Sequence, residues 1–183
     1  MTRTAVLFAT VLALGACNKG PEVSAENASV EDVANQVAEA RKGSDFVRPG
    51  KWSAKITFEE FNMPGAPAGT PAMLQKMNES TKATESCLTP EEAKRPKADF
   101  FAGDNKNCRY EHFNMGGGKI DAVMNCSGDE AVRKMTLAGT YGPDQYQMKM
   151  TMDGKGMSGA PAGMSMKMRV DAKRIGECDK GDA

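Results

Sequence analysis

Methionine is the residue type with the most regular spacing in this chain. Six methionines alternate in two short runs, at Met148, Met150, Met152, Met164, Met166 and Met168. Alternation places side chains on one face of a β-strand. If the two runs form a hairpin centred on residue 158, the pairs 148–168, 150–166 and 152–164 lie opposite each other. Thioether sulfur is a soft ligand that suits Cu(I) or Ag(I), so the ladder is a candidate soft-metal site.

The same spacing has two other interpretations. The side chains between the methionines are polar, as in any hairpin that turns one face to a core, and methionine fills such apolar positions well. A flexible methionine face also suits an acyl chain or another apolar ligand. A buried ladder would indicate packing, and a ladder open to solvent would indicate one of the two binding functions.

The other chemically capable residues do not form a catalytic pattern. His112 is the only histidine, and strict alternation places it on the same strand face as Tyr110. No nucleophile motif accompanies it. Adjacent acids such as Glu59 and Glu60 point to opposite faces of a regular strand, so they make poor acid–base pairs. We therefore expect no enzymatic activity and no cofactor.

The first residues are typical of a bacterial lipoprotein signal peptide. Arg3 precedes the apolar run AVLFATVLALG, residues 5–15, which is too short to span a bilayer. The run ends in Leu14-Gly15-Ala16-Cys17, which resembles a lipobox. We expect residues 1–16 to be removed and Cys17 to carry a membrane anchor of several acyl chains. By resemblance to the enterobacterial sorting rule, Asn18 favours the outer membrane, with the domain facing the periplasm.

Charge and compartment restrict the partners. Loss of Arg3 leaves 23 of the 24 basic residues against 24 acidic ones, which gives no indication of nucleic-acid binding. The expected partners are the membrane, through Cys17, and either an apolar ligand or another envelope protein. Four further cysteines, Cys87, Cys108, Cys126 and Cys178, are an even number in an oxidising compartment and predict two disulfides. We favour Cys87–Cys108 with Cys126–Cys178, and Cys108–Cys126 is the rival pairing.

The rest of the chain predicts one domain, residues 29–183, behind a polar tether over residues 17–28. Ser29 and Asp32 make a capping-box variant that starts a helix, and Gly43 can end it. Period-2 alternation then predicts a strand over residues 51–60. Residues 73–87 are expected to be irregular and then a strand, and Thr89 and Pro90 start a short helix.

Further strands are expected over residues 108–113, 119–126, 132–141, 145–152 and 164–172, with a hairpin turn at Gly117. The predicted fold is mainly β: a single antiparallel meander or incomplete barrel of about seven strands, with one N-terminal helix and two disulfides.

Several short motifs together resemble a known family. They are Pro49-Gly50-Lys51-Trp52, Cys87-Leu88-Thr89-Pro90-Glu91-Glu92, the Cys108 to Cys126 hairpin, Gly139-Thr140-Tyr141-Gly142, and Arg174-Ile175-Gly176-Glu177-Cys178. Their order and spacing resemble the domain of unknown function family 3617, exported and often lipid-anchored proteins of Gram-negative bacteria. The resemblance covers roughly residues 45–178 and implies an envelope location and a β-rich domain. It implies no activity and no functional residue. We therefore expect an envelope lipoprotein with a binding or structural role, and periplasmic soft-metal binding is the alternative.

Overall fold

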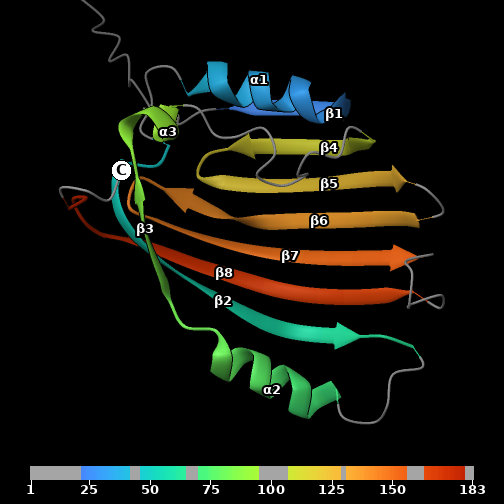
Figure 1. The fold of residues 1–183 in the computed structure, drawn as a ribbon. Coiled ribbons are helices and arrows are strands. Elements are labelled where there is room, and N and C mark those ends of the chain that lie inside the picture. The colour runs from blue at the N-terminus through green and yellow to red at the C-terminus, as the bar shows by residue number, and fades with distance from the viewer. Residues whose placement is uncertain are drawn as a thin grey trace, which may run out of the picture.

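The computed structural model describes residues 22–41, 46–64, 70–94, 107–128, 131–155 and 163–179. These residues form one open antiparallel sheet of eight strands in the spatial order β1-β4-β5-β6-β7-β8-β2-β3 (Figure 1). The strands are Val23–Ser29 (β1), Gly50–Asn62 (β2), Thr84–Leu88 (β3), Cys108–Gly116 (β4), Lys119–Gly128 (β5), Ala131–Gly142 (β6), Gln145–Lys155 (β7) and Met164–Gly176 (β8). The described helices are Val30–Ala40 (α1), Thr70–Ser80 (α2) and Pro90–Lys94 (α3). The expected mainly β fold is confirmed, as an open sheet.

The additional strand, β1, lies in the segment that we expected to be a tether. Val23–Ser29 pairs antiparallel with β4, from Val23 opposite Met115 to Ser29 opposite Arg109. Val23 and Ala25 are buried and Ser24 is exposed, so a short period-2 pattern is present. Its small and polar residues make the pattern weak, and pairing with β4 makes it a strand. Residues 1–21, which include the expected signal peptide and Cys17, lie outside the described residues.

Helix α1 begins where the sequence predicts. The Ser29 side-chain oxygen accepts the Asp32 backbone N–H at 3.0 Å, which satisfies one of the free donors of the first turn. Val33, which is 3% exposed, joins the core cluster of the sheet. Helix α1 packs on β1 and β4 and so covers one end of the sheet (Figure 1). The expected helix end at Gly43 lies outside the described residues.

Helix α2 corrects the expectation of irregular chain after residue 73. It protects the sheet edge at β2, because β3 pairs only with Gly50–Ala54 and leaves the rest of that edge without a strand. The Asn78 side chain accepts the Phe58 N–H and donates to the Phe58 carbonyl, both at 2.8 Å. One amide side chain thus makes both bonds that a neighbouring strand residue would make. This contact joins two elements that are distant in the sequence, so local periodicity could not predict it.

The disulfides also correct the sequence analysis. The favoured pairing is wrong: Cys108 bonds Cys126, as in the rival pairing, and Cys87 bonds Cys178. Cys108 and Cys126 are direct partners in the β4–β5 register. Strands β3 and β8 both flank β2, which brings Cys87 near the chain that follows β8. Two disulfides indicate an oxidising compartment outside the cytoplasm.

We predict unequal contributions from the two disulfides to stability. Cys87–Cys178 closes a separation of 91 residues and Cys108–Cys126 closes one of 18 residues. In the chain-entropy model the longer loop stabilises more, by about 1.4 kcal/mol. Urea unfolding of the paired variants Cys87→Ser with Cys178→Ser, and Cys108→Ser with Cys126→Ser, measures the difference. Equal losses would contradict loop closure as the dominant effect.

Candidate binding site

Strand register gathers the apolar side chains of one sheet face, here called the concave face, into rows that cross the strands. Each member of a row lies directly opposite the next, about 4.5 to 5.5 Å apart at Cβ. One row runs from β8 to β5 as Met166, Met152, Met135 and Met124. The next runs as Met168, Met150, Leu137 and Ala122. The concave face therefore carries methionine from four adjacent strands.

The predicted methionine pairs are two residues out of register. Met150 lies opposite Met168 and Met152 opposite Met166, while Met148 faces Val170 and Met164 faces Gly154. A slip of two residues keeps every side chain on its face, so alternation fixed the face and could not fix the partner.

Sequence reasoning missed Met135. It lies on β6, where the concave positions carry odd numbers, and it stands opposite both Met152 and Met124. The alternation Met135, Leu137, Gly139, Tyr141 was the available signal. It was overlooked because it mixes residue types, whereas the β7 and β8 runs repeat methionine.

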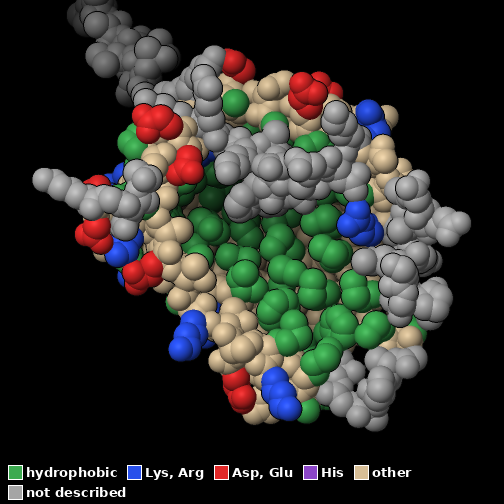
Figure 2. Space-filling model, viewed as in Figure 1, with side chains coloured by type: hydrophobic (Ala, Val, Ile, Leu, Met, Phe, Trp, Pro, Cys, Tyr) green, Lys and Arg blue, Asp and Glu red, His purple; other side chains and the backbone are tan. Residues whose placement is uncertain are grey.

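Burial falls across the concave face. At the end under α1, Met115 and Met124 are each 3% exposed. Farther along, Met148 is 9% exposed, the other five predicted methionines are half-buried, and Ile56 on β2 reaches 39%. Figure 2 shows apolar side chains gathered on this open part of the face. The methionine ladder is therefore neither fully buried nor fully open.

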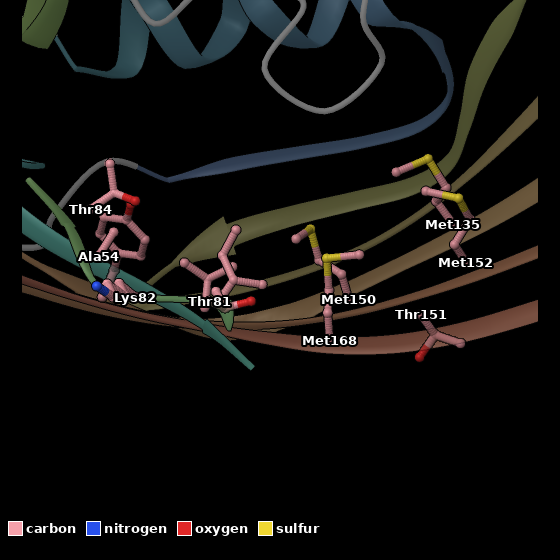
Figure 3. A pocket seen from close by; sticks show the side chains of 12 residues that line it. Ala54, Thr81, Lys82, Thr84, Met135, Met150, Thr151, Met152 and Met168 are labelled. Carbon is pink, nitrogen blue, oxygen red and sulfur yellow. The ribbon is translucent and has the colours of Figure 1, made fainter. Parts of the chain in front are cut away.

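A hollow of about 450 Å³ lies in the half-exposed part of the concave face. This volume is within the range of small-molecule sites. Its apolar lining includes Ile56, Met135, Tyr146, Met150, Met152, Met168 and Val170. In Figure 3 Met150 lies beside Met168 and Met135 beside Met152, as the register requires. Thr81, Lys82 and Thr84 lie toward the other end of the hollow.

The opposite, convex face carries charged side chains, and those on β2 and β8 include several ion pairs. Arg169 donates to Glu59 at 3.1 Å and to Asp171 at 2.8 Å, and Lys167 pairs with Glu60. Hydrogen bonds from Gln147 and then Arg169 lower the pKa of the Asp171 carboxyl. A register shift in β2 between Phe58 and Glu60 lets both adjacent acids pair with β8 cations, against the expectation of opposite faces. Each of these charges has a partner, as expected of a solvated sheet surface.

His112 belongs to the convex side as well. A register shift in β4 between Tyr110 and His112 interrupts the regular alternation. The prediction that His112 shares a strand face with Tyr110 is therefore wrong. Its Nε2 lies 2.7 Å from the Asp121 carboxylate. Among the residues that the structure describes, no cluster of three His, Cys, Asp or Glu side chains is placed to hold a metal ion.

A family model described as a protein of unknown function, DUF3617, matches residues 47–178. The chain belongs to the DUF3617 family. The match agrees with the resemblance inferred from the motifs, and it spans β2 to the cysteine that follows β8. No curated protein and no solved structure matches the chain. Within the described part of this DUF3617 protein, no helix is long and apolar enough to cross a membrane.

The buried Tyr110 side chain predicts that the stability of the fold is sensitive to alkaline pH. Burial raises the pKa of Tyr110 to about 12, because desolvation disfavours the phenolate. Above about pH 10 the unfolded chain loses this proton while the folded chain keeps it, so stability falls as pH rises.

We therefore expect Tyr110→Phe to reduce this alkaline loss of stability. Between about pH 9 and about pH 11, the free energy of unfolding of the wild type should fall by about 1.4 kcal/mol more than that of the variant. Urea unfolding at both pH values measures these free energies. Tyr141 and Tyr146 are present in both proteins, so their contributions cancel in the comparison. An equal loss of unfolding free energy in the wild type and in Tyr110→Phe would contradict the raised pKa of Tyr110.

Proposed function

We propose that this protein is a non-enzymatic lipoprotein of the bacterial cell envelope whose concave face binds an acyl chain or a similar apolar molecule. The observation that carries the proposal is the hollow of about 450 Å³ in the half-exposed methionine face. A site of this kind binds by shape and apolar contact, and thioether side chains adapt to irregular ligands. The convex face carries charged and polar side chains, several of them paired with one another, so the apolar concave face is the better candidate for an apolar ligand.

The proposed anchor fits this function. Acylation of Cys17 would hold the protein in the outer membrane with the domain in the periplasm. Strand β1 begins at Val23, six residues after Cys17 in the sequence. Six extended residues span at most roughly 20 Å. The short tether keeps the domain close to the membrane, which is the main source of acyl chains in the envelope.

The test uses the anchor-free protein, residues 17–183 with Cys17→Ser and both disulfides formed. N-phenyl-1-naphthylamine, an uncharged apolar fluorophore, should bind saturably with an increase in fluorescence. Met150→Glu should weaken binding by about tenfold or more, because a carboxylate on the hollow wall must lose water when the ligand binds. The matched control Ala138→Glu puts the same charge on the convex face of β6 and should bind like the wild type. Equal affinities in the two variants would reject the concave face as the site.

A second candidate function, soft-metal binding, is favoured by one specific observation. Met135, Met152 and Met166 stand directly opposite one another on β6, β7 and β8 and are half-buried. Three neighbouring thioethers suit Cu(I) or Ag(I). This row replaces the six-methionine hairpin ladder as the most compact candidate.

Titration of the anchor-free protein with Ag(I), followed by NMR of the methionine methyl groups, tests the second candidate. The signals of Met135, Met152 and Met166 should shift and saturate at a stoichiometric ratio. Met73 on α2 is exposed and lies outside this row, so it reports non-specific binding. Shifts that appear equally at Met73 would contradict a metal site.

A further inference from the structure

Arg41 is the one buried charged residue among the residues that the structure describes. It follows the last residue of α1, and its backbone N–H donates to the Val37 carbonyl at 3.1 Å. Its exposed fraction is 9%. Arginine at this depth is uncommon unless its charge is paired.

The Arg41 guanidinium makes no hydrogen bond and no ion pair with any described residue. Its contact is with an aromatic ring: Cζ lies 4.4 Å from the centroid of Phe46. A guanidinium has five N–H donors, and a ring face does not replace oxygen acceptors for them. Burial lowers the pKa of Arg41 to about 10, which reflects the cost of removing this charge from water. The carbonyl end of α1 favours a cation but offsets only a small part of this cost.

Arg41 is linked to the hollow by a series of neighbouring aromatic side chains. Phe46 packs on Tyr141 with ring centroids 4.4 Å apart. Tyr141 is the register partner of Tyr146, and Tyr146 lines the hollow. The ring of Tyr146 lies 5.7 Å from that of Trp52. A chain of neighbouring aromatic side chains thus leads from Arg41 to Tyr146, at the hollow that the methionines also line.

We propose that Arg41 binds the anionic head group, a carboxylate or a phosphate, of an amphiphile whose acyl chain lies on the aromatic and methionine surface. This inference rests on the proposed function and names its ligand class. A planar guanidinium can bind either anion in a bidentate manner. Lys82 is the competing cation, since it also lines the hollow, but it is exposed and remains solvated without an anion.

Three amphiphiles of equal chain length test the head-group preference: dodecanoate, dodecyl phosphate and uncharged dodecanol. Each displaces N-phenyl-1-naphthylamine from the anchor-free protein. At least one anionic amphiphile should bind about tenfold or more tightly than dodecanol, because charge-assisted hydrogen bonds discriminate by this amount. The two anionic arms distinguish a carboxylate head group from a phosphate.

The matched variants Arg41→Gln and Lys82→Gln locate the anion. Arg41→Gln should lower the anionic affinity to that of dodecanol and leave dodecanol binding unchanged. The control Lys149→Gln, at an exposed lysine on the convex face of β7, should behave like the wild type. Lys82→Gln should keep the preference for an anionic head group, and Arg41→Lys should recover part of the preference that Arg41→Gln loses. Loss of the preference in Lys82→Gln alone, or equal binding of all three amphiphiles to the wild type, would overturn the assignment to Arg41. Absence of binding by every amphiphile would reject the proposed function itself.

A stability measurement separates a binding role from a structural one. Without ligand, Arg41→Gln should have a Tm equal to or above that of the wild type, because it removes a buried charge that has no acceptor. Saturating anionic amphiphile should raise the Tm of the wild type more than that of the variant. A clear loss of Tm in ligand-free Arg41→Gln would assign the guanidinium to the structure and contradict the proposal.

Discussion

An antiparallel sheet with one apolar face must cover that face, and the rest of this structure depends on how it does so. Helix α1 packs on β1 and β4, and the side chains beneath it, such as Phe113 and Met124, are almost fully buried. From β6 toward β2 the same face continues with half-buried methionines and Ile56. One short helix is narrower than eight strands. The part of the face that no described helix covers is where we propose that a ligand binds.

An open sheet also has two edges, and each is handled by a tertiary contact. At one edge β1 ends the sheet with a short strand of small and polar residues. At the other, β3 covers only the start of β2, Asn78 of α2 bonds Phe58 farther along, and Cys87–Cys178 ties β3 to the chain after β8. Such protection limits pairing with other chains.

The surface that we propose for the amphiphile combines two chemistries that come from distant parts of the sequence. Arg41 follows the end of α1, Tyr141 and Tyr146 lie on β6 and β7 beside their turn, and the methionine rows cross β5 to β8. Alternation along β6 and β7 places these tyrosines and methionines on the same face of the sheet. A cation at one end and thioethers at the other fit a ligand with a charged head and an apolar chain. The spacing of the methionines alone could not predict that a cation lies at one end of this surface.

The sequence by itself determined the features that depend on local patterns: the capped start of α1 at Ser29, the alternating strands, and the face on which Met150 and Met168 lie. These follow from capping and from the two-residue period of a strand. Tertiary structure decided the disulfide pairing, the addition of β1, the edge contact of Asn78 and the register of the methionine rows. It also decided the faces of Glu59 and His112, where register shifts interrupt the period. Alternation leaves two-residue slips undetermined and cannot foresee a bulge, because both depend on which strand lies alongside.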